Sequence, residues 1–349
     1  MAAYSFLDQL LHRLALQAVP IAELSFDIDQ RMVGTDPKDI VGERHVFVSG
    51  LARAGTTVLM RHFHATGAYR SLTYRDMPFV LAPNLWRKLA RSSKRDVAAA
   101  ERAHGDRIFV DVDSPESLDE VFWRIFAGEE YIEKTHLKPH SPDPETTWKY
   151  VCYVNAILNA QDTRLPRYLS KNNNNILRLN GIRGAFPQAL ILIPFRDPLS
   201  HAGSLLRQHR NFVEMQAESR FVRSYMTWLV HHEFGHDHRP FRFGEDGRSV
   251  PSSYGTNAIE YWVDMWCATY GWLERSAPED AIFVCYEDLC GGMEVWTRLA
   301  TIAGITTVRE EDETFRLSNV RVEPTNDLDL AEQASAIYAR LVDRGRAAL

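Results

Sequence analysis

The 349-residue sequence contains only four cysteines, and no two of them form a C-x-x-C pair. At this length four scattered cysteines do not make a disulfide framework, so we expect a reducing compartment, the cytoplasm. Long apolar runs are also absent, and no stretch reaches the roughly 18 residues that a membrane-spanning helix needs. Acidic residues (46) outnumber lysine and arginine (40), which gives a net charge of −6. These absences argue against a disulfide-rich secreted protein, an integral membrane protein and a nucleic-acid-binding protein.

The composition that remains is typical of a globular protein, with 45% hydrophobic and 25% charged residues. The first 30 residues or so read as an amphipathic helix and not as a signal peptide, because Asp8, His12 and Arg13 interrupt the apolar stretch. No convincing linker divides the chain. We therefore expect a single domain over residues 1–349, with a core of about 45–290 and a C-terminal helical region of about 291–349.

Short apolar segments alternate with longer segments of helical periodicity. The expected strands are His45–Ser49, Arg107–Val112, Ala189–Phe195 and Ala281–Tyr286, and the expected helices are Thr56–Ala65, Pro115–Phe126, Pro198–Arg210, Ile259–Arg275 and Glu294–Ala303. Continuously apolar strands separated by helices are typical of a parallel sheet that is buried on both faces. The pattern predicts a three-layer α/β fold. Residues 136–148 and 236–256, rich in proline or in Gly, Pro and Ser, are expected to be long surface loops.

Residues 50–57 read GLARAGTT and directly follow an expected strand. They have the frame of a phosphate-binding P-loop, but Thr56 stands where the lysine belongs. At a strand–turn–helix junction, Gly50 permits a sharp turn and Gly55 permits close approach of the backbone to a ligand. The helix N-terminus then favours an anion, although an ordinary turn with an N-cap threonine is the alternative. The side chains that would add hydroxyls and a cation are Thr56, Thr57 and Arg53.

A second stretch, ALILIPFRDPLSHAGSLLR, again runs from a strand into a helix. Arg196 lies at the junction, and open α/β sheets bind ligands at this carboxyl end of their strands. Ser204 follows eight residues later, about two helical turns along and on the same side. The pair predicts a second anion site. Two anion sites at neighbouring strands indicate a nucleotide with phosphates at both ends.

The two motifs together resemble those of the sulfotransferases that depend on 3′-phosphoadenosine 5′-phosphosulfate (PAPS), in a bacterial form that is distantly similar to tyrosylprotein and carbohydrate sulfotransferases. In that family [PR]-[KR]-S-G-T-T binds the 5′-phosphosulfate, and R-x-P-x(5)-S binds the 3′-phosphate. The resemblance implies a P-loop-like sulfotransferase fold with long acceptor-side loops. It assigns donor binding to Arg53, Ala54, Gly55, Thr56, Thr57, Arg196, Ser204 and Tyr286, the last in CYEDL. Ala54 replaces the usual serine and offers only its backbone N–H.

The resemblance also implies the reaction, a direct in-line transfer of the sulfuryl group from PAPS to a hydroxyl acceptor. The product is 3′-phosphoadenosine 5′-phosphate (PAP), and no metal is expected. Arg53, together with Lys171 in a segment similar to the N-K-D-P stretch of tyrosylprotein enzymes, would stabilise the leaving phosphate oxygen. We expect a carbohydrate hydroxyl as acceptor, ahead of a phenol, a lipid or a peptide tyrosine.

The residue that takes the acceptor proton is not given by the resemblance. Related enzymes place a glutamate shortly after the first helix, where this sequence has Thr73. Asp76 is the first candidate, and a carboxylate paired with Arg75 is its alternative reading. His136 is the second candidate, against an exposed loop histidine. Asp111 and Asp113 are geometrically feasible at the end of an expected strand.

One motif points to another class of enzyme. Residues 232–236, HEFGH, match the zinc-hydrolase pattern H-E-x-x-H, which requires a helix. His232 and His236 would be the two zinc ligands, and Glu233 would be the general base. The downstream carboxylate would be Glu260 or Asp264. Gly235 and Pro240 argue against that helix. A non-catalytic nucleotide-binding module is a third reading, favoured if Lys171 and every candidate base prove dispensable.

Overall fold

The computed structural model describes residues 6–90, 100–101, 109–110, 116–160, 165, 167–244, 253–305, 315–317 and 325–349. Seven strands lie in these ranges: β1 (Val46–Val48), β2 (Tyr69–Arg70), β3 (Ala100–Glu101), β4 (Phe109–Val110), β5 (Arg167–Lys171), β6 (Leu190–Phe195) and β7 (Ile282–Cys285). The longer helices are α1 (Phe6–His12), α2 (Val19–Gln30), α3 (Thr56–Ala65), α4 (Pro83–Ala90), α5 (Glu120–Tyr131), α6 (Pro144–Asn159), α7 (Leu179–Ala185), α8 (Pro198–Glu218), α9 (Arg220–Trp228), α10 (Ile259–Ser276), α11 (Tyr286–Cys290), α12 (Glu294–Ile302) and α13 (Leu328–Ala348). Short helical turns are η1 (Arg13–Gln17), η2 (Pro37–Ile40), η3 (Tyr74–Asp76) and η4 (Asn173–Leu177).

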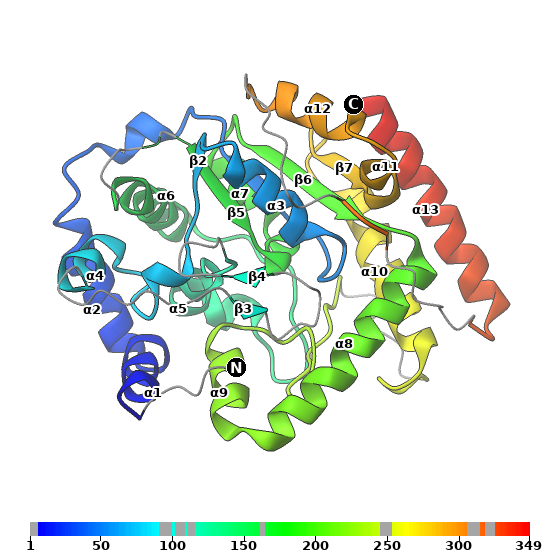
Figure 1. The fold of residues 1–349 in the computed structure, drawn as a ribbon, viewed down its shortest axis with the longest axis horizontal. Helices are drawn as coiled ribbons and strands as arrows, with labels where there is room; N and C mark the ends of the chain where they lie inside the picture. Colours follow the sequence, from blue (N-terminus) through cyan, green and yellow to red (C-terminus); the bar gives the residue numbers. More distant parts are fainter. Residues whose placement is uncertain are drawn as a thin grey trace.

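Five strands form one sheet in the order β2-β5-β1-β6-β7, and every neighbouring pair is parallel (Figure 1). In this register Val48 of β1 lies opposite Lys171 of β5 and Leu192 of β6. The carboxyl ends of the three central strands therefore meet at one edge of the sheet. This edge is where an open α/β sheet places its ligands.

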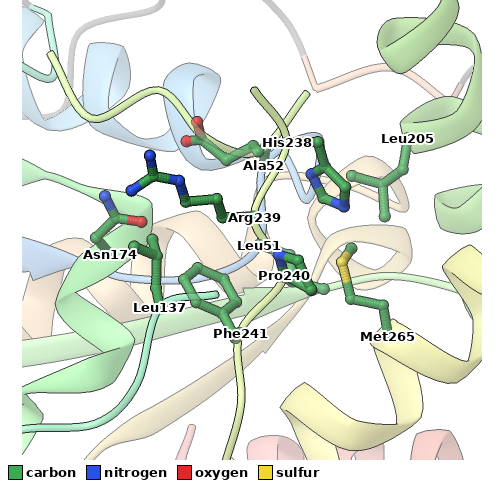
Figure 2. Close-up of a pocket in the computed structure, with 11 residues that line it drawn as sticks. Leu51, Ala52, Leu137, Asn174, Leu205, His238, Arg239, Pro240, Phe241 and Met265 are labelled. Atoms are coloured by element: carbon green, nitrogen blue, oxygen red, sulfur yellow. The ribbon is translucent and has the colours of Figure 1, made fainter. Parts of the chain in front are cut away.

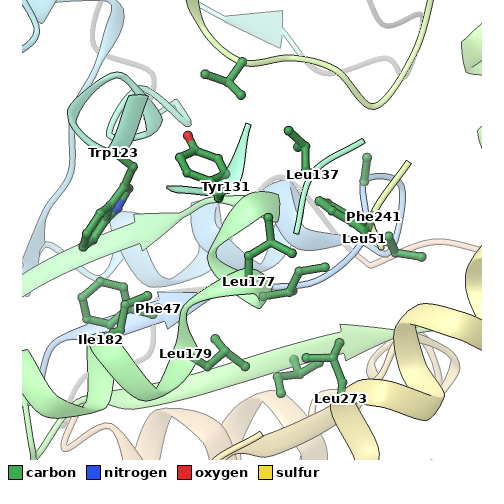
Figure 3. Packing of buried hydrophobic residues seen from close by; sticks show 14 of the residues in the cluster. Phe47, Leu51, Trp123, Tyr131, Leu137, Leu177, Leu179, Ile182, Phe241 and Leu273 are labelled. Atoms are coloured by element: carbon green, nitrogen blue, oxygen red, sulfur yellow. The ribbon is translucent and has the colours of Figure 1, made fainter. Parts of the chain in front are cut away.

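Both faces of the sheet are buried, and the division follows the two-residue period of a strand. Val46 and Val48 belong to a hydrophobic cluster with side chains of α3 and α12. Phe47, between them, belongs to a larger cluster on the other face. Figure 3 shows part of that larger cluster, with Phe47 of β1 near Trp123 of α5 and Ile182 of α7. The predicted three-layer α/β class is therefore confirmed.

Three predictions about elements were wrong. The described part of the predicted strand Arg107–Val112 is β4, which pairs antiparallel with β3 in a separate two-stranded sheet and not with the parallel sheet. The predicted loop 136–148 ends early, because Asp143 caps α6 by accepting hydrogen bonds from Glu145 N and Thr146 N at 2.8 and 2.9 Å. The N-terminal region is not one helix, since it contains α1, η1 and α2. No helix in the described ranges is long and apolar enough to cross a bilayer.

Candidate active site

The loop of residues 49–55, here called loop 49–55, connects β1 to α3. A Cβ atom on Gly50 would lie 2.6 Å from Pro194 O, so only glycine lets the loop run this close to β6. Gly55 has a φ of +85°, and a Cβ there would lie 2.3 Å from Cδ2 of Tyr286. The close approach that we predicted for Gly55 is thus made to the Tyr286 ring. The Ala54 N–H donates to Leu51 O at 3.3 Å and is used within the turn.

The N-terminus of α3 follows this loop. Thr56 is buried, Thr57 is half-buried, and the N–H groups of the first helical turn have no acceptor inside the helix. Arg53 adopts a φ of +70°, and its Nε donates to the Ser204 hydroxyl on α8 at 3.2 Å. The two anion motifs of the sequence, almost 150 residues apart, therefore adjoin in the fold.

Arg196 occupies the position where β6 gives way to α8. Its guanidinium lies 5.6 Å from the centre of the Tyr286 ring, which also lies against Gly55. The side chain is buried, and its Nε has no hydrogen-bond partner among the residues that the structure describes. In the same described ranges, the buried hydroxyl of Ser49, directly after β1, lacks a partner as well. Buried donors need acceptors, and phosphate oxygens match both a guanidinium and a hydroxyl.

Positive charge gathers around the start of α8. His201 donates its Nε2–H to Ala52 O at 2.8 Å, and burial followed by the charges of Arg196 and Arg53 lowers its pKa to about 3. Burial and the charge of Arg196 also lower the pKa of Arg207. Arg207 was missed in the sequence, although it follows Ser204 by three residues and so lies on the same side of α8. Three arginines thus make an electropositive cluster beside loop 49–55.

Lys171 ends β5 and is buried at the same edge of the sheet. The next residue, Asn172, is held by two carboxylates: its Nδ2 donates to Glu120 Oε2 at 2.6 Å and to Asp119 Oδ1 at 3.2 Å. Glu120 is itself paired with the Arg178 guanidinium through two contacts of 3.0 Å. This buried network fixes the chain direction immediately after Lys171. No local motif predicts this network, because its members come from three separate segments.

The two candidate bases have different surroundings. Asp76 is buried; its carboxylate accepts two hydrogen bonds from Arg70 Nη2, at 2.8 and 2.9 Å, and one from Thr73 N at 2.7 Å. It completes a capping box at η3, on the side of β2, the outer strand. His136 is half-buried, and its Nδ1 lies 3.1 Å from the Thr135 hydroxyl. Burial and then the charge of Arg242 lower the pKa of His136. Asp111 and Asp113 lie outside the described residues.

The HEFGH motif does not form a helix, so the structural premise of the zinc site was wrong. Helix α9 ends at Trp228, and Gly235 has a φ of +83° that no α-helix accommodates. His232 Nδ1 lies 3.0 Å from Asp237 O, and Glu260 instead accepts from Asn326 N at 3.1 Å. Over the described ranges, no three His, Cys, Asp or Glu side chains are grouped so as to hold a metal ion.

The segment 233–241 lies against loop 49–55 and encloses a small pocket with it (Figure 2). Leu51 and Ala52 of the loop line this pocket together with His238 and Arg239. His238 also lines a second, larger cleft of about 510 Å³. The other side chains of that cleft are His209, Arg210, Val213, Glu214, His236, Thr256 and Asn257. The polar cleft and the pocket at loop 49–55 therefore share the His238 side chain.

Comparison with known proteins identifies the family of this chain. No curated protein sequence gives a significant match. Among solved structures, the chain is similar to the sulfotransferase STF1 from Mycobacterium tuberculosis, with 16% identity, 99% of this chain and 87% of that chain covered, and a TM-score of 0.45. It is also similar to the sulfotransferase STF9 from Mycobacterium avium, with 15% identity, 91% and 75% covered, and a TM-score of 0.40. Residues 45–239 match the model of the sulfotransferase family. The chain belongs to the sulfotransferase family.

Proposed function

We propose that this chain transfers the sulfuryl group of PAPS to a carbohydrate hydroxyl. The main support for PAPS as the donor comes from Arg196. Its Nε is buried and has no hydrogen-bond partner among the described residues, so an anionic acceptor would satisfy it. The N-terminus of α3 and the Arg53–Ser204 contact lie at the same edge of the sheet. A nucleotide with separate 5′- and 3′-phosphates would meet donors at both ends.

In this proposal the 5′-phosphosulfate is held by the N-terminus of α3, with Arg53, Thr56 and Thr57, and the backbone of Ala54 and Gly55 shapes the loop. The 3′-phosphate is held by Arg196 and Ser204. Tyr286 packs between Gly55 and Arg196 and so sets the spacing of the two sites. Lys171, at the end of β5, stabilises charge that develops on the leaving phosphate oxygen.

The proposed acceptor follows from the cleft that shares His238 with the pocket at loop 49–55. Its imidazole, guanidinium, carboxylate, hydroxyl and amide groups are the partners that sugar hydroxyls use, and few apolar side chains line it. We place the enzyme in the cytoplasm, since all four cysteines are free.

Transfer of ³⁵S from labelled PAPS to a panel of methyl glycosides tests this function, with phenol and tyrosine-containing peptides as comparison acceptors. We expect labelled glycosides and no labelled phenol. Labelled phenol in place of glycoside would overturn the carbohydrate proposal. Failure of the protein to bind PAP in calorimetry would overturn the donor.

A further inference from the structure

A hydroxyl that attacks sulfur loses its proton, and the protein has to supply a group that accepts it. Asp76 is a poor choice, because Arg70 and Thr73 already occupy its carboxylate. His136 does not line the pocket beside loop 49–55. Glu233 does, and the proposed function gives this residue of the HEFGH segment no role.

Two contacts fix the Glu233 carboxylate. Its Oε1 accepts a hydrogen bond from Asn173 Nδ2 at 3.0 Å, and its Oε2 lies 3.5 Å from His231 Nδ1. Asn173 begins η4, two residues after Lys171. The carboxylate is therefore tied to the segment that presents Lys171. Its side chain is 15% exposed, so it is mostly withdrawn from bulk water.

The pocket relates Glu233 to the donor site. Leu51 and Ala52 of loop 49–55 line the pocket together with Glu233 and Asn174. The Ala52 carbonyl accepts a hydrogen bond from His201, and the charges of Arg196 and Arg53 both lower the pKa of His201. His238 lines both this pocket and the polar cleft, so Glu233 and the proposed acceptor cleft are related through that one side chain.

We propose that Glu233 is the catalytic base of the sulfuryl transfer, a role that rests on the proposed function. The acceptor oxygen forms a bond to sulfur while the bond from sulfur to the bridging oxygen of PAPS breaks. The proton of the acceptor hydroxyl passes to the Glu233 carboxylate, and the bridging oxygen leaves as part of the PAP phosphate. Electrons and atoms balance without an oxidant or a metal.

The charge state of Glu233 is set by its neighbours. Burial alone would raise its pKa, but the hydrogen bond and charge of His231, with the Asn173 amide, lower the pKa to about 2. The charge of Glu233 in turn opposes the lowering of the His232 and His238 pKa values by burial, and Arg239 lines the same pocket. Glu233 is therefore ionised before the acceptor arrives.

The test compares Glu233→Gln and Glu233→Ala with the wild-type protein, using release of PAP from PAPS in the presence of methyl glycosides. Glu233→Gln keeps the size of the side chain and should lower turnover about 10²-fold or more. Glu145→Gln, an exposed glutamate on α6, is the matched control and should keep wild-type turnover. Added formate should restore part of the activity of Glu233→Ala and none of that of Asp76→Asn.

The outcomes separate this inference from the proposed function. If the wild-type protein binds PAP and forms PAP from PAPS, then wild-type turnover in Glu233→Gln would overturn only the role of Glu233. Loss of turnover in Glu233→Ala without recovery in formate, together with weakened PAP binding, would make Glu233 a structural residue and would equally overturn the inference. A wild-type protein that binds no PAP would overturn the proposed function and this role with it.

Discussion

At the scale of single residues, Arg196 is the sharpest probe of the donor site. Replacing Arg196 with alanine removes a buried guanidinium and should weaken PAP binding by about 2–4 kcal/mol. Adenosine 5′-phosphosulfate, which lacks the 3′-phosphate, should bind the variant and the wild type about equally. Calorimetry measures both, with Arg298→Ala, an exposed arginine paired with Glu294, as the control. A wild type that binds the two nucleotides equally would contradict the assignment of the 3′-phosphate to Arg196.

Asp76 gives a residue-scale prediction about stability. Its ion pair with Arg70 is buried, with 8% and 11% of the two side chains exposed, and removing one partner leaves the other charge uncompensated. Asp76→Asn should therefore lower the free energy of unfolding by about 3 kcal/mol, as measured by urea denaturation. A variant of wild-type stability that has lost turnover would instead restore Asp76 as the catalytic base.

Residues within a local motif could be predicted, and residues assembled by tertiary structure could not. Arg53 and Arg196 were found because each occupies a fixed place in a strand–loop–helix segment. Glu233 and Asn173 lie 60 residues apart, and only the fold brings them to 3.0 Å. HEFGH was misread for the same reason: a sequence pattern does not reveal that Gly235 has a positive φ.

At the scale of elements, α3 offers a matched pair of glycines. Gly55 precedes the helix and Gly67 follows it, and both have positive φ, but only at Gly55 would a Cβ atom meet a neighbour, the Tyr286 ring. Gly55→Ala should displace the N-terminus of α3 and weaken PAP binding by about tenfold or more, whereas Gly67→Ala should cost only about 1 kcal/mol of stability. Calorimetry and urea denaturation measure the two effects. Equal PAP affinity in the two variants would contradict a role of α3 in holding the phosphate.

The network that fixes the corner after β5 should make stability depend on pH. Burial raises the pKa of Asp119 to about 6, from 3.8 in an unfolded chain. Between these values the folded protein binds a proton that the unfolded chain releases, so the contribution of Asp119 to stability falls as pH rises from about 4 to 6. The total change is at most about 3 kcal/mol, since one pKa unit is about 1.4 kcal/mol. Urea denaturation of wild type and Asp119→Asn should show this difference, and parallel pH curves would contradict it.

Elements with a strong apolar signal were predicted well. β1, β6 and β7 were found, and α3 has the predicted bounds, because each strand is continuously apolar and α3 follows a glycine. β5 was missed because its sequence, RYLSK, has polar residues at both ends and only two apolar residues between them. β2 has two residues and carries no periodic signal. Such strands are defined by their neighbours in the sheet.

At the scale of the whole molecule, the net charge of −6 hides a local excess of positive charge. Arg53, Arg196 and Arg207 lie close enough together to affect the pKa of His201 or of one another. Composition could therefore argue against a polyanion as partner but could not reveal a site for a small anion. The organisation of the chain as a single domain of 1–349 stays a prediction.

Binding of the donor should raise the free energy of unfolding of the whole fold, because the proposed site joins β1, β6, α3 and α8. PAP at 100 times its dissociation constant should stabilise the folded state by about 2.7 kcal/mol. For a chain of this length that corresponds to an unfolding temperature higher by about 4 °C, measured by scanning calorimetry. Adenosine 5′-phosphosulfate at the same concentration should give a smaller rise, because it cannot engage Arg196 and Ser204.

Chelator should change neither the unfolding temperature nor the effect of PAP, since His232 and His236 do not share a helical face. A fall in unfolding temperature with chelator, reversed by zinc, would show that the HEFGH segment binds a metal after all.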